Sequence, residues 1–350
     1  MKPDPKKRKA EVHKEMMEQV KKILTERGSK ALEEARKQVL QEEIECKQAR
    51  KALTYFMSEY WQDVFGPTLL SLGCEAVGGD SSLTTPIAVP LILISGAIDI
   101  HDDIIDQSKS KWLRPTVFGK FGKDIALLVG DALFFKGFKL LYEAVEKGIS
   151  AEKVAAIVDI IEKTFFELGD AEALELSFRG RIDITPKKYL YVMRKKAADV
   201  EACTHISALL GGGSKEEVET LKEYGRLLGM MIILRDDLLD MIDFDEAMHR
   251  IRKESLPLPI LYALQKPEIK SILSPLLQKK GIKKRDVKTI LSTTDEAGGL
   301  DFCTKIIQEL AENAYDRIEK LRYSVKYLKL LTKSVLPPLD EWRNLATANV

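Results

Sequence analysis

Six aspartates in two copies of one pattern are the residues of this chain whose types and spacing could do chemistry. Each copy reads Asp-Asp-x-x-Asp, and the copies are Asp102, Asp103 and Asp106, and Asp236, Asp237 and Asp240. On a helix the first and last carboxylates of a copy share one face, where they repel each other by about 3 kcal/mol at roughly 6 Å and an effective dielectric constant near 20. Clustered carboxylate oxygens suit Mg²⁺, which binds through one or two carboxylates together with substrate phosphates.

A solvated helix face is the commoner explanation for one acidic motif alone. Here, however, both copies stand among apolar neighbours, such as Ile100 and Ile104 in the first and Leu234 and Leu238 in the second. Solvation explains two such copies poorly, because charged groups are costly beside apolar surroundings unless they are paired. We therefore predict that both motifs meet a positive charge.

Length and composition narrow the class of protein. The chain has 350 residues, 45% hydrophobic and 31% charged, with a net charge of +1, which is typical of soluble globular proteins and gives no argument for binding nucleic acid. Its four cysteines are far apart and no signal peptide precedes them, which indicates the cytoplasm. The longest nearly uncharged run, residues 86–98, is shorter than the roughly 18 residues of a spanning helix, so we predict no transmembrane segment.

Apolar residues recur every three or four positions along most of the chain, which predicts helices. We expect two amphipathic helices within residues 10–50, separated at Gly28-Ser29, and a central helix over residues 86–106 that is apolar nearly all round. Further helices are expected at 186–210, 215–241 and 301–331, and no alternating segment of strand length stands out.

These elements predict an all-α fold with one domain over residues 1–350, in which residues 1–50 form N-terminal helices and the core spans about 51–345. Both acidic motifs lie near the ends of central helices. We therefore place them at the mouth of a central cavity enclosed by a helical bundle.

The ligand that such a cavity predicts has a polyanionic head and an apolar tail. A prenyl diphosphate fits this description, since Mg²⁺ would stabilise the leaving pyrophosphate while the allylic carbon becomes cationic, and a dry apolar pocket would protect that cation from water.

With these motifs the sequence resembles the trans-isoprenyl diphosphate synthases of the polyprenyl synthetase family. The resemblance covers about residues 50–265, and its most specific segments are Ile100–Asp106, Pro115-Thr116-Val117, Phe121-Gly122, Gly130–Leu133, Arg235–Asp240 and Lys253–Leu258. It implies an isoprenoid synthase-type helical bundle, a homodimer, and a prenyltransferase that uses Mg²⁺ and an allylic prenyl diphosphate.

The resemblance also implies roles for individual residues. The six aspartates of the two motifs would be set around Mg²⁺, and Lys111, Lys196 and Lys253 would bind the substrate diphosphate. At the position of Ala97, relatives that limit the length of their product carry a bulky aromatic side chain. The small alanine leaves room for a long prenyl tail. Asp99 is an additional carboxylate, for which pairing with a cation is favoured over a role in the metal cluster.

The sequence departs from the family where isopentenyl diphosphate should bind. Gln62 to Pro67 lacks the basic residues of the family's Gly-Gly-Lys-Arg-x-x-Arg-Pro segment, Ser95 replaces a histidine, and Trp112 replaces an arginine. Nearby Lys47, Lys51, Lys109 and Arg114 could form a different clamp. Two alternatives to chain elongation stay open: a terpene synthase-like enzyme that ionises one prenyl diphosphate and uses another acceptor, and a weakly active subunit that partners a competent synthase.

Overall fold

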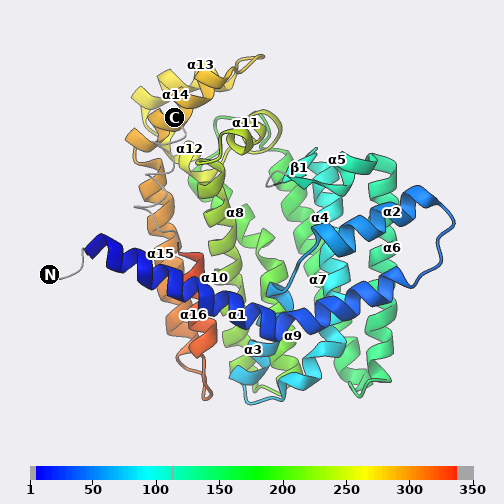
Figure 1. Cartoon of the computed structure of the whole chain (residues 1–350). Coiled ribbons are helices and arrows are strands. Elements are labelled where there is room, and N and C mark those ends of the chain that lie inside the picture. Colours follow the sequence, from blue (N-terminus) through cyan, green and yellow to red (C-terminus); the bar gives the residue numbers. More distant parts are fainter. Residues whose placement is uncertain (1–4, 112–113, 337–350) are drawn as a thin grey trace. The chain divides into compact units, whose positions relative to one another are not determined.

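A computed structural model describes residues 5–111 and 114–336 of the chain (Figure 1). Almost every element in this part is a helix, which confirms the predicted all-α class. The α-helices are α1 Pro5–Leu40, α2 Lys47–Tyr55, α3 Phe65–Ala76, α4 Thr85–Ile105, α5 Val117–Phe121, α6 Lys123–Tyr142, α7 Ala151–Leu176, α8 Pro186–Lys196, α9 Ala198–Gly211, α10 Lys215–Asp240, α11 Phe244–Lys253, α12 Leu258–Ala263, α13 Pro267–Leu277, α14 Lys284–Glu296, α15 Gly299–Ile318 and α16 Lys326–Val335. A π-helical turn, η1, covers Phe56–Tyr60, and two 3₁₀ turns cover Ser81–Thr84 and Glu143–Val145.

The chain divides into two compact units. The first contains the described residues up to 160 together with 203–218 and 321–330, and the second contains 161–202, 219–320 and the described residues from 331. The first acidic motif belongs to the first unit and the second motif to the second unit. The single domain and the central cavity that the sequence suggests therefore stay predictions.

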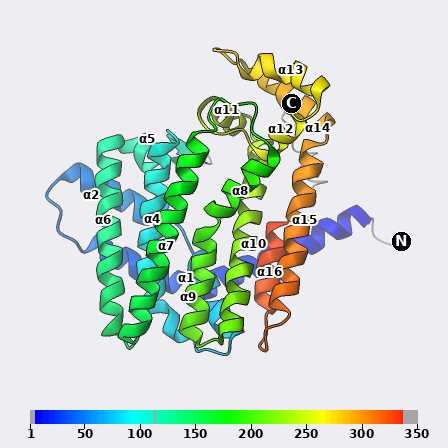
Figure 2. The same ribbon diagram turned by 180° about the vertical axis from the view of Figure 1, so that it is seen from behind.

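In the first unit, α4 and α6 pack side by side along their lengths (Figures 1 and 2). Gly137 of α6 allows this close approach, because a Cβ there would lie 2.7 Å from Cγ1 of Ile94. The helical stretch Ser81–Ile105 is long and apolar enough to cross a membrane by length and composition, but 61% of its 18-residue apolar window is buried inside the structure. Such burial is typical of a core helix.

In the second unit, α12 packs against α8, α14 and α15. The rings of Tyr262 on α12 and Phe302 on α15 stack with centroids 4.2 Å apart. The middle of α10 is also buried, including Leu228, Met231 and Leu234. This core fixes the helix that carries the second acidic motif.

Three expectations about element boundaries are wrong. The N-terminal region is one helix, α1, which continues through Gly28 because that glycine lies against the backbone of Val64, where a Cβ would not fit. Residues 186–210 form two helices that meet at Ala197, and 301–331 is divided between α15 and α16. A short antiparallel hairpin of two-residue strands, β1 Ser110–Lys111 and β2 Arg114–Pro115, follows α4 and is too short to give an alternating pattern in the sequence.

The end of α4 holds a non-glycine residue in the left-handed region. Gln107 has φ 58°, while the N–H of Ser108 donates to the carbonyl oxygen of Asp103 at 2.9 Å, as in a Schellman motif. Replacing Gln107 by Gly is expected to raise the free energy of unfolding by about 0.5–1 kcal/mol, because glycine adopts this conformation without steric cost. Urea unfolding measures the change. Gln41→Gly, at the end of α1 where φ is negative, is the control and should not stabilise; equal effects would contradict this explanation.

Candidate active site

The first acidic motif lies at the C-terminal end of α4. This helix begins with Pro86 in its first turn, a favoured position for proline, and its last regular residue is Ile105. Asp103 is fully buried, whereas Asp102 and Asp106 are partly exposed. Because Asp102 and Asp106 are four residues apart, they share a face of α4 that differs from the face of Asp103.

The hairpin after α4 returns Lys111 to the motif. Nζ of Lys111 lies 2.8 Å from Oδ1 of Asp103 and 3.1 Å from Oδ1 of Asp99. Burial raises the pKa of Asp103; Lys111 opposes this rise and Asp99 adds to it, and the resulting pKa is about 7. The carboxylates of Asp99 and Asp103 hold the pKa of Lys111 well above its ordinary value despite burial, so Lys111 stays charged. Asp99 therefore pairs with a cation, which is the interpretation favoured in the sequence analysis.

Carboxylate oxygens at this motif fit Mg²⁺ in their chemistry. Asp102 and Asp106 offer such oxygens from one partly exposed face of α4, whereas Asp99 and Asp103 are paired with Lys111. No group of three or more His, Cys, Asp or Glu side chains in residues 5–111 and 114–336 is arranged to hold a metal ion by itself. Mg²⁺ commonly takes only one or two carboxylates and completes its shell with phosphate oxygens and water, so a carboxylate pair is sufficient.

His101 lies beside the motif but faces α6. Its Nε2 is 3.3 Å from Oδ1 of Asp131, and its ring contacts Phe134 edge-on with centroids 5.2 Å apart. Gly130 makes room for it, because a Cβ at that position would lie 2.5 Å from Nε2. His101 therefore packs against α6, with Nε2 close to the carboxylate of Asp131.

The second acidic motif lies at the C-terminal end of α10, and its central residue is the most enclosed. The carboxylate of Asp237 accepts hydrogen bonds from the Tyr189 hydroxyl at 2.8 and 2.9 Å, the Leu258 N–H at 3.0 Å and Nη2 of Arg250 at 2.9 Å. Burial raises its pKa to about 6, although Arg250 and the Leu258 N–H act in the opposite direction.

Arg250 reaches the motif because the chain reverses after α10. Asp243 accepts hydrogen bonds from the N–H groups of Asp245 and Glu246 and so begins α11, on which Arg250 lies two turns later. Nη1 of Arg250 is 3.5 Å from Oδ2 of Asp240. Burial raises the pKa of Asp240 to about 7 against the opposing charge of Arg250.

The two motifs therefore share one arrangement. In each, the central aspartate is buried against a cation, Lys111 for Asp103 and Arg250 for Asp237. The outer aspartates are less enclosed, as shown by Asp236, whose side chain is 48% exposed and pairs with neighbouring Arg235 at 2.9 Å. The outer pair of each motif is thus better placed to meet a ligand than the central residue.

The other predicted diphosphate-binding lysines differ in environment. Nζ of Lys196 lies 2.6 Å from both Oε1 of Glu172 and Oε2 of Glu175 on α7. Lys253 is exposed at the end of α11. Ala97 is completely buried in α4, and Trp112 lies outside the described residues. The assignments of Lys111, Lys196, Lys253 and Ala97 to the substrate stay predictions, although Lys111 and Lys196 already face two carboxylates each.

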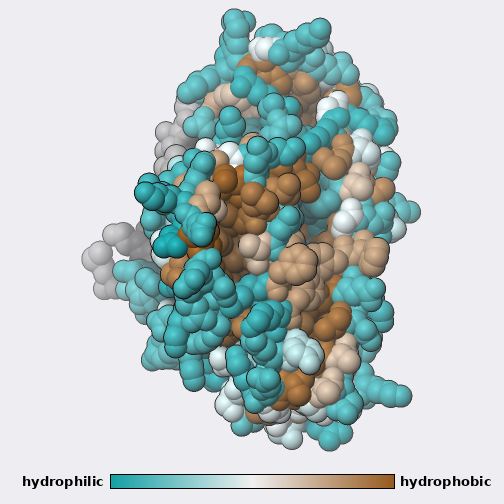
Figure 3. Space-filling view, turned by 90° about the vertical axis from the view of Figure 1, so that its right-hand side faces the viewer, coloured by the Kyte–Doolittle hydropathy of each residue, from teal (hydrophilic) through white to brown (hydrophobic). Residues whose placement is uncertain are grey.

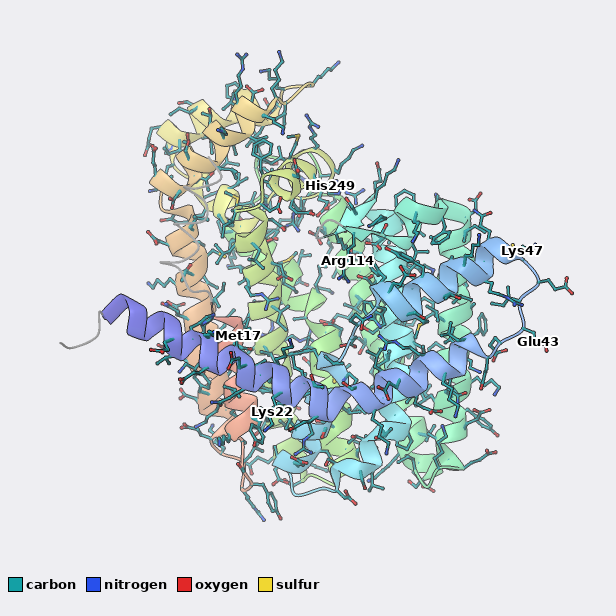
Figure 4. All side chains as sticks on the ribbon, in the orientation of Figure 1. Met17, Lys22, Glu43, Lys47, Arg114 and His249 are labelled. Atoms are coloured by element: carbon teal, nitrogen blue, oxygen red, sulfur yellow. The ribbon has the colours of Figure 1, made fainter. Side chains whose placement is uncertain are left out.

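Two of the basic residues considered as a different clamp, Arg114 and Lys47, lie at different places in the first unit. Arg114 lies at the hairpin, where Nη1 approaches the carbonyl oxygen of Glu59 at 3.5 Å, and Lys47 begins α2 at the end remote from Arg114 (Figure 4). Sequence reasoning missed Tyr189 and Glu175 as residues of this site. The sequence Thr185-Pro186 predicts the start of α8, the helix that carries Tyr189. It does not predict that Tyr189 contacts Asp237.

The free energy of unfolding is expected to depend on pH through Glu175. Burial alone would raise its pKa, but Lys196 and Arg250 lower it to about 2 from an ordinary 4.5. Because the folded-state pKa is the lower one, the stabilisation is complete above pH 4.5 and is lost as the pH falls towards 2, by about 3 kcal/mol in total. Urea unfolding at pH 6 and pH 3 should show a smaller loss for Glu175→Gln than for the unmodified protein. Glu296→Gln, an exposed site on α14, should match the unmodified protein; a matching loss in Glu175→Gln would contradict the assignment.

Comparisons with known proteins agree with this architecture. A family model described as polyprenyl synthetase matches residues 30–294. A geranylgeranyl diphosphate synthase of Methanosarcina mazei is 30% identical over 278 residues, which cover 77% of this chain and 84% of that protein. The solved geranylgeranyl pyrophosphate synthetase of Pyrococcus horikoshii has a TM-score of 0.79 and 25% identity, covering 90% of this chain and 98% of its own. A polyprenyl synthetase of Streptomyces coelicolor, at 22% identity, shares the fold with a TM-score of 0.78, covering 91% and 100% of the two chains.

Proposed function

Because the chain belongs to the polyprenyl synthetase family and is a prenyltransferase of isoprenoid biosynthesis, we propose that it acts on an allylic prenyl diphosphate held through Mg²⁺ by both acidic motifs. The observation that carries the proposal is the repeated arrangement of a buried, cation-paired central aspartate with less enclosed aspartates on either side. Asp102, Asp106, Asp236 and Asp240 are the proposed ligands, while Asp103 and Asp237 position them.

When bound, Mg²⁺ would act as a Lewis acid that stabilises the leaving pyrophosphate. Asp102 and Asp106 hold the head of the substrate at the end of α4, and Asp236 and Asp240 do so at the end of α10. Lys111 and Arg250 keep the central carboxylates in place and partly neutralise each motif. Lys196 and Lys253 are proposed to approach the diphosphate when it binds.

Incubation with labelled geranyl, farnesyl and geranylgeranyl diphosphates tests this function. The reactions are run with Mg²⁺ or with EDTA, and with or without isopentenyl diphosphate. We expect pyrophosphate release that requires Mg²⁺. A longer product that forms only with isopentenyl diphosphate identifies elongation, and release without it identifies another acceptor. No release from any allylic diphosphate would contradict the proposal.

We also propose that the protein is a cytoplasmic homodimer. The four cysteines, Cys46, Cys74, Cys203 and Cys303, are free thiols, which supports a reducing compartment. The face of α6 supports dimerisation, because Leu128, Phe135 and Tyr142 recur every seven residues and are 62%, 79% and 76% exposed. Apolar side chains also gather on the side of the molecule drawn in Figure 3, the right-hand side of Figure 1, where α6 lies. A second copy could cover this face around a twofold axis.

Phe135→Glu is expected to shift the protein from dimer to monomer in light scattering coupled to size-exclusion chromatography. Burial of one large apolar side chain contributes about 1.5–3 kcal/mol, and a twofold contact would lose this contribution on both subunits. Leu83→Glu is the matched control, since Leu83 is 43% exposed but lies outside α6. Equal behaviour of the two variants would exclude α6 as the interface.

A further inference from the structure

Positive charge is concentrated on a part of the second unit that the proposed site does not use. We call residues 269–294, which span most of α13, the loop after it and most of α14, the basic hairpin. They include seven lysines and arginines but a single acidic residue, Asp286, and so carry a net charge of +6 in a chain whose total is +1. The rest of the chain is therefore net negative, and the basic hairpin is where an anionic partner would be attracted.

The cations of the basic hairpin are exposed, whereas its acidic residue is buried. Oδ2 of Asp286 accepts a hydrogen bond from the N–H of Lys283 at 2.8 Å and lies 2.9 Å from Nζ of Lys279, which closes the hairpin between α13 and α14. The two helices pack together at one end of the second unit (Figures 1 and 2). The exposed cations are Lys270, Lys279, Lys280, Lys283, Lys284, Arg285 and Lys288. The surface of the hairpin thus presents positive charge with little compensating charge of its own.

Apolar side chains on α13 are exposed next to these cations. Ile272 is 48% exposed, and Ile269 and Leu276 are partly exposed. Because these three residues recur at intervals of three and four, they share one face of α13, while Leu273 is fully buried. A helix with an exposed apolar face and lysines and arginines beside it is typical of proteins that lie on a membrane surface.

Two observations favour a membrane over a nucleic acid as the partner. Residues 263–301 contain no aromatic side chain on which an unpaired base could stack. An exposed Ile272 gives no advantage in binding phosphate groups, whereas at a bilayer surface it is removed from water. The chemistry of the enzyme agrees, since the prenyl chain that a prenyltransferase handles is an apolar hydrocarbon that partitions into bilayers. We propose that the basic hairpin binds the surface of membranes that contain anionic lipids.

The basic hairpin is attached to the helix that supports the second acidic motif. Arg252 on α11 donates a hydrogen bond to the carbonyl oxygen of Ile282 in the loop between α13 and α14. Two residues earlier on the same helix, Arg250 lies 2.9 Å from the carboxylate of Asp237. Membrane binding would therefore hold the second motif close to the bilayer, where a prenyl tail can enter or leave the protein with little exposure to water.

Co-sedimentation with phosphatidylcholine vesicles, with or without phosphatidylglycerol, tests the inference. We expect binding that requires phosphatidylglycerol and weakens as the NaCl concentration is raised, because salt screens the attraction. A cation close to an anionic membrane contributes about five-fold in affinity, so the triple variant Lys280→Gln, Lys284→Gln, Arg285→Gln should bind about 100-fold more weakly. Equal affinity for neutral and anionic vesicles would overturn the inference.

The matched control is the triple variant Lys22→Gln, Lys163→Gln, Lys305→Gln. These lysines are exposed and lie on α1, α7 and α15, outside the basic hairpin, so the net charge changes by the same amount. This variant should retain the affinity of the unmodified protein to within about five-fold, the contribution of one cation. Equal losses in the two triple variants would show that net charge alone attracts the protein and would overturn the role of the basic hairpin.

The apolar face of α13 separates a membrane from a nucleic acid. Ile272→Ser should weaken vesicle binding about five-fold, since part of this side chain is already buried, and Ile272→Leu should bind as the unmodified protein does. Neither variant should change the affinity for duplex DNA in a mobility-shift assay. Binding to DNA that is tighter than binding to anionic vesicles, or vesicle binding that does not respond to Ile272→Ser, would overturn the membrane assignment.

The inference goes beyond the proposed function and is tested separately from it. Vesicle binding is measured in EDTA and without a prenyl diphosphate, so it does not depend on the acidic motifs. Binding through the basic hairpin without pyrophosphate release from any allylic diphosphate would support the inference while contradicting the proposed function. Pyrophosphate release by a protein that does not bind anionic vesicles would overturn the inference alone.

Discussion

Asp237→Ala is expected to lower the free energy of unfolding by about 3–5 kcal/mol. The substitution leaves the buried guanidinium of Arg250 without its shortest carboxylate contact and removes the acceptor for the Tyr189 hydroxyl and the Leu258 N–H. The loss arises from the two buried donors left without an acceptor and from the weaker pairing of Arg250, whose remaining contacts with Asp240 and Glu254 are longer, at 3.5 and 3.3 Å. Urea unfolding followed by circular dichroism measures the effect.

Asp236→Ala is the matched control for this prediction. Asp236 belongs to the same motif and is also charged, but its side chain is 48% exposed and forms an ion pair with adjacent Arg235. Its replacement should cost no more than about 1 kcal/mol, which is typical of surface ion pairs. Equal destabilisation by the two substitutions would contradict the prediction that the buried contacts of Asp237 stabilise the fold.

Asp102→Ala is expected to slow pyrophosphate release from an allylic diphosphate about 10³-fold or more, equivalent to about 4 kcal/mol of transition-state stabilisation. The reason is that Asp102 is a proposed Mg²⁺ ligand whose role an alanine cannot replace. Because Asp102 is only partly buried, the free energy of unfolding should change by no more than about 1 kcal/mol. Steady-state kinetics at saturating Mg²⁺, together with urea unfolding, measures both quantities.

Asp159→Ala removes an exposed carboxylate of α7 outside both motifs and should leave the rate within about two-fold of that of the unmodified protein, as expected for a surface change. Activity of Asp102→Ala within ten-fold of the unmodified protein would contradict the role of Asp102. A large loss of stability in Asp102→Ala would instead assign the residue to the fold.

Helices with a regular apolar pattern could be predicted from the sequence. The apolar run 86–98 followed by the first motif indicated α4 to within a residue at each end, because a helix of this length needs a continuous apolar face to pack. The continuous α1 was missed for the opposite reason. Gly28 resembles a helix end in sequence, but its role is set by contact with Val64, which no local pattern reports.

The same limit applies to the site. The motifs themselves were evident from spacing, and pairing of Asp99 with a cation was the favoured interpretation. The partners of Asp237 could not be predicted, because Tyr189 and Arg250 come from two other helices whose packing against α10 depends on the tertiary fold. Lys111 was assigned to the substrate by its position in the family resemblance, and its contact with Asp103 was not predicted because no local pattern indicated the short hairpin that returns it to α4.

Metal binding by the two acidic motifs is tested most directly by calorimetric titration of Mg²⁺ into the protein with a non-hydrolysable allylic diphosphate analogue present. We predict binding that weakens at least ten-fold, or about 1.4 kcal/mol, in both Asp102→Ala and Asp236→Ala, but not in Asp159→Ala. Unchanged Mg²⁺ affinity in both motif variants would contradict the proposed role of the motifs.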